Sequence, residues 1–301
     1  MNQSFANHGF ATSRARDIGA VPVGRVSAAK AHRRNLQDRL VLLQKDYAEL
    51  HTAIFEAAQV HRRLCAPRLL QFAEFEIASE IFAVRHLPGD FFTVEEKDGG
   101  VILALGDICG KGLAAGMWTT HVAGLVQAHA TRTSIPEEII HGVNSDLCLM
   151  SALRPFASLF LAKLDPITGV LNYCSAGHPP ALVLRANGEI ELLSEGGLLL
   201  GVLSDAVYEH GTIQLELGDT LLVYSDGITE SLNKAGEEFG CARLEKQLRQ
   251  APADSADSIL FSLLGAVQDF AATRALVDDM TVAVIRRANA EASTVSAARA
   301  A

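Results

Sequence analysis

The chain has 301 residues, of which 49% are hydrophobic and 20% charged, and its formal net charge is -9; this composition supports a packed core in one large domain with an appendage, or in two domains. Because the chain is acidic and its main body lacks a cluster of Lys and Arg, we expect no nucleic-acid partner. The chain has five cysteines and no Cys-x-x-Cys pair, which argues against a disulfide framework and against a thiolate zinc site. It has neither an apolar run of about 18 residues nor an apolar signal-peptide core. We therefore expect no membrane span and a cytoplasmic location.

The two ends of the chain are expected to be loose. Residues 1–27 form a mixed stretch with no sustained hydrophobic period, which predicts a disordered leader. Residues 288–301 are rich in Ala and Ser, which predicts a loose tail.

Residues 28–66 carry the heptad pattern of a coiled coil. No Gly or Pro interrupts them, and Pro67 ends or kinks the segment. We predict a helix that forms a parallel coiled coil and makes the protein a homodimer; the alternative is one amphipathic helix packed on its own domain. The seam-compatible residues recur at alternating spacings of 4 and 3, at Leu36, Leu40, Leu43, Tyr47, Leu50, Ile54, Ala57, His61 and Leu64.

The main body, residues 67–287, mixes strands and helices. Nine short runs rich in β-branched and aromatic residues predict strands, at 76–83, 101–107, 157–164, 170–175, 181–185, 189–193, 212–217, 220–224 and 281–286. Three amphipathic stretches predict helices, at 113–130, 136–150 and 259–270. Because the strands come in runs with hairpin-length gaps and the helices come in blocks, we expect an α+β fold with mainly antiparallel sheets.

Five aspartates stand at the ends of predicted strands or in turns: Asp90, Asp107, Asp226, Asp278 and Asp279. Carboxylates at strand ends can converge on one rim of a sheet, and a ligand set made only of oxygen suits Mg²⁺ or Mn²⁺. Two such ions about 3.5–4 Å apart can clamp a phosphoryl group. An aspartate before a glycine or at a strand end is also an ordinary turn or cap residue. Spacing alone therefore leaves a shared metal site and a set of solvated caps both open.

Three further features have both a structural and a chemical interpretation. The segment Gly106-Asp-Ile-Cys-Gly-Lys-Gly112 is either a cradle for phosphate or a tight strand-to-helix turn. His178, which precedes two prolines, is either a structural histidine or a general acid. Cys109 lies beside Asp107, whose negative charge disfavours a thiolate, so we do not expect Cys109 to be a nucleophile.

Taken together, these motifs resemble those of the SpoIIE-type serine/threonine phosphatases, the sigma-factor-regulating branch of the metal-dependent protein phosphatase (PPM) superfamily. The resemblance runs from about residue 57 to about residue 287. It implies two stacked antiparallel sheets flanked by helices, and hydrolysis of phosphoserine or phosphothreonine by a metal-activated water. The matching segments are Gly89-Asp-Phe-Phe92, Gly106-Asp-Ile-Cys-Gly-Lys-Gly-Leu-Ala-Ala115, Ser175-Ala-Gly-His-Pro-Pro180, the run from Leu217 to Glu230, Gly236-Glu-Glu-Phe-Gly240 and Asp278-Asp-Met-Thr281.

The resemblance also implies a role for each candidate ligand of two divalent cations, Mn²⁺ or Mg²⁺. Asp107 would bridge the two ions, and the backbone carbonyl of Ile108 would join the second. Asp226 and Asp278 would hold the first ion, and with Asp107 they would act in catalysis through the activated water. Asp90 would serve the second ion directly or through water. Asp279 is the less favoured ligand and would orient its neighbours.

One departure from the family pattern keeps a second function open. The family often reads Gly-Asp-Phe-Tyr-Asp where this chain reads Gly89-Asp-Phe-Phe-Thr93, so a tyrosine hydroxyl and a carboxylate are missing. The five aspartates remain, but the surroundings of the metals would differ. The alternative is therefore a non-catalytic or weakly active phosphoprotein-binding module of the same fold.

The resemblance finally implies a partner. The usual substrate in this family is a phosphorylated anti-sigma-factor antagonist, a small STAS-domain protein. Because residues 1–66 are too few for a PAS, GAF or receiver domain, we expect the activating signal to come from an upstream protein that binds the predicted coiled coil, or from oligomeric state.

Overall fold

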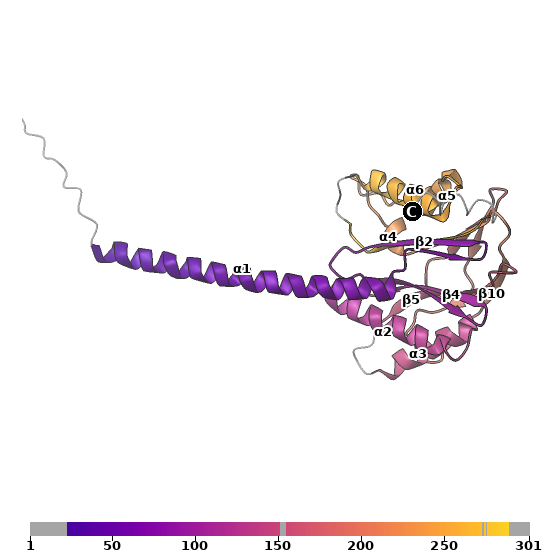
Figure 1. The fold of residues 1–301 in the computed structure, drawn as a ribbon, viewed down its shortest axis with the longest axis horizontal. Helices are drawn as coiled ribbons and strands as arrows, with labels where there is room; N and C mark the ends of the chain where they lie inside the picture. The colour runs from indigo at the N-terminus through magenta and orange to yellow at the C-terminus, as the bar shows by residue number, and fades with distance from the viewer. Residues whose placement is uncertain (1–22, 151–154, 273, 275, 289–301) are drawn as a thin grey trace, which may run out of the picture. The chain divides into compact units, whose positions relative to one another are not determined.

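The computed structural model describes residues 23–150, 155–272, 274 and 276–288. The chain divides into two compact units, Met1–Ala53 and Ile54–Ala301, and the second unit contains the strands and the helices that follow α1 (Figure 1). Residues 1–22 of the predicted leader and residues 289–301 of the predicted tail lie outside the described residues. Within the described ranges, no helix combines the length and the apolar character needed to cross a bilayer.

Helix α1 (Val23–Cys65) begins before the predicted start at residue 28. Before His61, five large apolar side chains of the predicted seam are more than half exposed, at Leu36, Leu40, Leu43, Tyr47 and Leu50. His61, which the heptad pattern assigned to the seam, is instead buried, and the neighbouring Cys65 joins the core of the second unit. The coiled coil and the dimer therefore stay predictions for the part of α1 that precedes His61.

Two β-sheets form the centre of the second unit. The first runs in the order β1-β2-β12-β11-β7-β8, with β1 at Leu69–Phe72, β2 at Phe75–Phe82, β12 at Met280–Arg287, β11 at Thr220–Tyr224, β7 at Ala181–Leu184 and β8 at Ile190–Leu193. The second runs in the order β10-β6-β5-β4-β3, with β10 at Gly211–Gln214, β6 at Val170–Ala176, β5 at Ala157–Leu164, β4 at Gly100–Ile108 and β3 at Asp90–Lys97. The short β9 (Gly196–Gly197) pairs in parallel with β6, and the other pairings among the described strands are antiparallel.

The sheets stack face to face and helices cover their outer faces, which gives four layers (Figure 1). Helices α2 (Leu113–Ala130) and α3 (Pro136–Leu149) pack on the second sheet. Helices α5 (Gly240–Gln250) and α6 (Ala256–Ala271) pack on the first. A third cluster of buried side chains, which includes Phe92, Leu105, Val223 and Ile285, lies between the sheets. The predicted α+β fold with two mainly antiparallel sheets flanked by helices is confirmed.

The helices follow from local sequence patterns. In α3, Pro136 lies in the first turn and Ile139, Val143 and Leu147 form a fully buried stripe at helical spacing. In α6, the Ser255 side chain caps the helix by accepting a hydrogen bond from the Ser258 N–H. Such caps and stripes depend on residues close in sequence, which is why the predicted bounds of these helices lie within a few residues of the observed ones.

The sequence prediction was wrong about the segment around Asp90, which was placed in a turn but begins strand β3. A two-residue turn at Asp98 and Gly99, with φ of 51° and 73°, folds β3 back on β4. An Asp-Gly turn with two positive φ angles is the common connection of a tight β-hairpin, so the signal was present in the sequence. Helix α5 was also missed, because only Leu244 and Leu248 of its residues are buried. Ala288, assigned to the tail, is buried and its N–H donates to the Glu74 carbonyl.

Candidate metal centre

One sheet contributes two of the five aspartates to a single row at its rim. Asp90 on β3 is the Cα partner of Asp107 on β4, and Ser158 on β5 is the next residue in the row. Side chains alternate between the faces of a strand, so Asp90 shares a face with Phe92 and Asp107 shares a face with Leu105. Both apolar residues lie between the sheets. The row therefore extends the inner face of the sandwich to its edge.

The other sheet contributes the remaining aspartates from the ends of β11 and β12. Ser225 and Asp226 directly follow β11, and Asp226 opens the short helix α4 (Asp226–Thr229). Asp278 and Asp279 directly precede β12, and Thr281 is the second residue of that strand. Since β11 and β12 are antiparallel neighbours, the end of one and the start of the other lie at the same rim.

A buried hydrogen bond joins the two sheets at this rim. The Thr281 hydroxyl donates to Oδ2 of Asp90 over 2.5 Å, and the Thr281 N–H donates to Oγ of Ser225 over 2.9 Å. All three side chains are almost completely buried. Asp90 is therefore held by the opposite sheet, although Thr281 is 191 positions away in the sequence.

Asp279 organises the loop that leads into Asp90. Its Oδ1 accepts a hydrogen bond from the Val84 N–H at 2.7 Å, and its Oδ2 accepts one from the Gly89 N–H at 2.6 Å. From the other side, the Thr119 hydroxyl of α2 donates to the Gly89 carbonyl at 2.7 Å. Both carboxylate oxygens of Asp279 thus bind backbone, which supports the orienting role that the sequence resemblance implied over a role as metal ligand.

Gly89 brings this loop against two predicted metal-binding atoms. A Cβ at Gly89 would lie 3.1 Å from the carbonyl oxygen of Ile108 and 3.5 Å from Oδ1 of Asp107. The Ile108 N–H donates to the Gly89 carbonyl at 3.2 Å. The Ile108 carbonyl and the Asp107 carboxylate therefore lie together beside the start of β3, as a shared ligand set requires.

The turn at Asp226 packs directly on the Asp278-Asp279 segment. A Cβ at Gly227 would lie 1.9 Å from the Asp279 carbonyl oxygen and 3.4 Å from the Asp278 Cβ, so only glycine fits this close approach. On the outer side, the Lys111 ammonium lies 2.6 Å from Oδ2 of Asp278. Asp278 thus lies between the Asp226 turn and a lysine.

Burial and mutual repulsion raise the pKa values of three carboxylates at this rim. Burial, with the Asp107 charge, raises the pKa of Asp90 well above its usual range, against the stabilising hydrogen bond from Thr281. Burial, together with Asp226, raises the pKa of Asp107 to about 6, although a hydrogen bond with the Asp90 side chain opposes the shift. Burial and the Asp278 charge raise the pKa of Asp226. Carboxylates this close need a shared proton or a cation between them.

The donor set fits hard divalent cations. It consists of carboxylates and one carbonyl, the oxygen ligands that Mg²⁺ and Mn²⁺ prefer, and its mutual repulsion is what positive charge would relieve. Among the residues that the structure describes, no three His, Cys, Asp or Glu side chains already surround one point as ligands do. Asp90 binds Thr281, Asp278 contacts Lys111 and Asp279 binds backbone. Binding an ion would therefore require side chains at this rim to exchange partners.

The surroundings of His178 and Cys109 favour neither a general acid nor a nucleophile. The Nδ1 atom of His178 lies 2.7 Å from Oγ of Ser158, and burial lowers the pKa of this histidine to about 3. A histidine that is neutral and buried at physiological pH cannot supply a proton as a general acid. Burial, reinforced by Asp107 and Asp226, raises the pKa of Cys109, which agrees with the prediction that it is no nucleophile.

Sequence reasoning missed the polar residues that support the aspartates. Thr281, Ser225 and Thr119 each bind the site or its loop through a hydroxyl, but Ser and Thr are common at strand ends and in helices. The sequence offers a usable signal only for Thr281 and Ser225. Each lies two residues from a side chain that points between the sheets, Ala283 and Val223 respectively, so it points to the same inner face. Thr119 carries no such signal, since its contact depends on where α2 lies.

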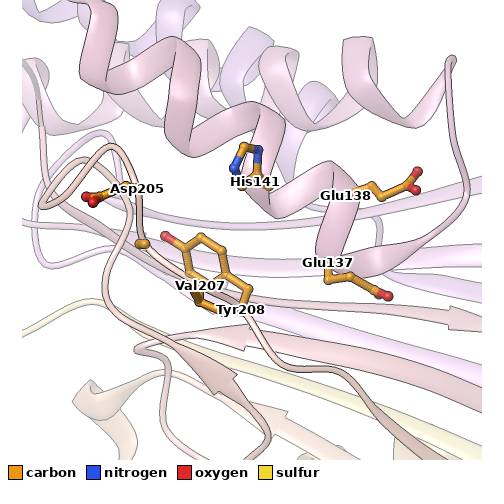
Figure 2. A pocket seen from close by; sticks show the side chains of 7 residues that line it. Glu137, Glu138, His141, Asp205, Val207 and Tyr208 are labelled. Atoms are coloured by element: carbon orange, nitrogen blue, oxygen red, sulfur yellow. The ribbon is translucent and has the colours of Figure 1, made fainter.

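A hollow of about 600 Å³ lies elsewhere, between α3 and residues 205–208. Figure 2 shows that the carboxylates of Glu137 and Glu138 point away from His141. The Oε1 atom of Glu137 lies 3.1 Å from Nδ1 of His210. None of the predicted ligands lines this hollow. The acidic side chains around it do not converge, so we assign the chemistry to the rim of the sandwich.

Comparisons with known proteins agree with this geometry. The sequence profile of the family described as stage II sporulation protein E (SpoIIE) matches residues 97–288. Phosphoserine phosphatase RsbU of Bacillus subtilis (strain 168) is 25% identical over 251 residues, which cover 79% of this chain and 71% of RsbU.

Solved structures share the fold. The SiaA-PP2C domain of Pseudomonas aeruginosa superposes with a TM-score of 0.70 at 17% identity, covering 80% of this chain and 98% of that domain. The catalytic domain of the serine/threonine phosphatase PstP in complex with two manganese ions superposes with a TM-score of 0.52 at 16% identity, covering 71% of this chain and 99% of that domain.

The family profile covers more than half of the chain and includes Asp107, Asp226, Asp278 and Asp279. The two stacked, mainly antiparallel sheets flanked by helices are those that the motifs led us to expect. The chain therefore belongs to the SpoIIE family.

Proposed function

We propose that this protein is a metal-dependent phosphatase that hydrolyses phosphoserine or phosphothreonine in a protein substrate. The observation that carries the proposal is the meeting of Asp90 and Asp107 from one sheet with Asp226 and Asp278 from the other at one rim. Burial, together with the charge of Asp226, raises the pKa of Asp107 to about 6, so a divalent cation bound at this rim would stabilise the fold.

The ligand roles that the family resemblance implies are compatible with the positions of these residues. The side chains of Asp90, Asp226 and Asp278 all influence the pKa of Asp107. We therefore assign Asp107 as the ligand that two ions would share. Asp226 and Asp278 would complete one ion site. Asp90, which follows Gly89 in the sequence, and the Ile108 carbonyl, which lies against Gly89, would complete the second ion site.

The chemistry then follows from the charges. Bound Mn²⁺ or Mg²⁺ would neutralise the phosphoryl oxygens and lower the pKa of a water poised for in-line attack. Without that positive charge, the aspartates at this rim would repel a phosphate monoester. Thr281, Ser225 and Asp279 position Asp90 and its loop through buried hydrogen bonds before an ion binds.

Hydrolysis of p-nitrophenyl phosphate with Mn²⁺ tests this proposal. We expect EDTA to abolish the activity, and D107N or D226N to lower it by at least about a hundredfold, because each removes a carboxylate ligand. The matched control is D254N, the same substitution at an exposed position before α6, which should leave activity unchanged. A metal-replete wild-type protein no faster than D107N, on a phosphoprotein as well as on the small ester, would refute the proposal.

The alternative, a non-catalytic or weakly active phosphoprotein-binding module, depended on the departure at Phe92 and Thr93. Thr93 alternates with Asp90 along β3, so the two side chains point to opposite faces of the sheet. Phe92 is buried between the sheets, on the same face as Asp90. A carboxylate at position 93 would therefore point to the face of the sheet opposite Asp90. Its absence leaves the face that carries Asp90 unchanged, and this favours the enzyme over the binding module.

We also propose that the substrate is a phosphorylated STAS-domain antagonist of an anti-sigma factor, and that α1 joins two copies of the chain. The exposed apolar seam at Leu36, Leu40, Leu43, Tyr47 and Leu50 supports the dimer. An upstream protein that binds this helix would supply the activating signal. Release of phosphate from a phosphorylated STAS protein, but not from an unrelated phosphoprotein at equal concentration, is the expected result; equal rates on both would contradict the substrate assignment.

A further inference from the structure

Lys111 makes a direct contact with the candidate metal centre. Its Nζ atom lies 2.6 Å from Oδ2 of Asp278 and donates a hydrogen bond to the Val277 carbonyl at 2.6 Å. The Lys111 side chain is 36% exposed and that of Asp278 is 34% exposed. The ammonium also acts on the neighbouring carboxylate, since its charge opposes the rise in the pKa of Asp226.

The backbone around Lys111 fixes where this ammonium can go. Lys111 lies between Gly110 and Gly112, whose φ angles of 123° and 84° are in the region that favours glycine. The segment connects β4, which carries Asp107, to α2. Lys111 therefore stands four residues after Asp107 in this short connection, and four flexible methylene groups carry its charge to Asp278.

We propose that Lys111 is a built-in competitor of the divalent cation for Asp278, an inference that rests on the proposed function. The Oδ2 atom that contacts the ammonium belongs to a carboxylate that must hold an ion together with Asp226. An ammonium and a divalent cation repel each other, and both seek the same anionic side chain. Lys111 therefore lowers the affinity of this ion site, and binding of the ion releases the lysine from Asp278.

A purely structural role for Lys111 leads to the opposite expectation. If the lysine only braced the segment 277–279 through the Val277 carbonyl and Asp278, its loss would loosen a ligand and weaken metal binding. If it competes, its loss strengthens metal binding. The sign of the change in Mn²⁺ affinity therefore separates the two roles, and catalytic activity is not needed to read it.

The test is titration of the chelator-treated full-length protein with Mn²⁺, followed by the electron paramagnetic resonance signal of free Mn²⁺. We expect K111Q to bind Mn²⁺ about three- to tenfold more tightly than the wild type, as the loss of a partly exposed ion pair allows. Gln can still donate to the Val277 carbonyl. K111R, which keeps the charge, should bind Mn²⁺ like the wild type, and the matched control K246Q removes an exposed lysine from α5.

The outcomes distinguish this inference from the proposed function. Weaker or unchanged Mn²⁺ binding by K111Q, with K246Q like the wild type, overturns the competition while the metal-dependent function stands. Absence of Mn²⁺ binding by the wild type and K111Q alike overturns both. Tighter binding by K246Q to the same extent also overturns the inference, because net charge would then explain the effect. Thermal unfolding of each variant with EDTA verifies that the fold is intact; if K111Q is unfolded, K111M takes its place.

Discussion

Asp90 and Asp107 illustrate how single residues at this rim favour function over stability. Their Cα atoms are cross-strand partners, and their side chains continue a face that is otherwise apolar. Burial and like charge raise the pKa of both carboxyls. Such pairs lower the stability of the ion-free fold and are retained where a ligand needs them. The sequence identified both residues, but it could not show that they are buried against each other.

This repulsion predicts that D107N stabilises the ion-free protein. The folded-state pKa of Asp107, about 6, exceeds its ordinary value, so the unfolded chain loses this proton first as the pH rises. The resulting cost is fully present above pH 6 and disappears as the pH falls below the ordinary value. In EDTA at pH 8 we expect D107N to be more stable than the wild type by about 1–2 kcal/mol, allowing for partial exposure.

Thermal or urea unfolding at pH 8 and at pH 4.5 measures this effect. The gain of D107N over the wild type should shrink at the lower pH, where the wild-type carboxyl is protonated. A difference in stability that is the same at both pH values, or a D107N protein that is less stable at pH 8, would show that the charge of Asp107 does not destabilise the fold.

At the scale of elements, the site depends on how closely connecting segments pack. The turn after β11 touches the segment before β12 through Gly227, and the loop before β3 touches β4 through Gly89. Helix α2 anchors the same loop through Thr119 and through Gly116, where a Cβ would lie 2.5 Å from the Cβ of Leu87. Strand ends therefore bring the aspartates to the rim, and tight contacts between loops set their final positions.

This packing predicts opposite effects for two glycine-to-alanine changes. G227A would place a Cβ 1.9 Å from the Asp279 carbonyl, so we expect a loss of about 2–4 kcal/mol in stability and weaker Mn²⁺ binding. G124A adds a methyl group to α2 where no atom lies within 4 Å, and helix propensity predicts a gain of about 0.5–1 kcal/mol. Urea unfolding and Mn²⁺ titration of both variants measure these effects. A G227A protein as stable as G124A would contradict the close contact.

At the scale of the whole molecule, α1 carries a stripe of apolar side chains that are exposed in the part of the chain that the structure describes. Leu43 and Leu50 are 65% and 60% exposed, and their heptad spacing suits a second helix. Exposed apolar side chains in such a row usually mark an interface.

The predicted dimer is tested by the double variant L43E/L50E. Burying two charges in each helix of a coiled-coil seam costs more free energy than the apolar contacts at those positions contribute to association. We therefore expect L43E/L50E to be a monomer in light scattering after size exclusion. V41E/L42E makes the same kind of change at two exposed residues outside the seam and should stay dimeric. If the two double variants have the same mass, the seam does not hold the dimer.

The sequence by itself determined what depends on near neighbours along the chain. The helix Leu113–Ala130 and the strands Ala157–Leu164 and Thr220–Tyr224 have the bounds that the sequence predicted, because hydrophobic period and turn residues act locally. The identity of the five aspartates followed from their place at strand ends and from the family motifs.

Only the tertiary structure decided how these aspartates differ. Asp279 binds the backbone of the loop before Asp90, Asp278 contacts Lys111, and Asp90 binds Thr281. Each of these contacts joins residues more than 160 positions apart, and so depends on which strands are neighbours and which face they share. The sequence pattern shows the hydrophobic period of each helix and strand. Which side chains meet depends on the order of the strands in the sheets and on how the two sheets pack together.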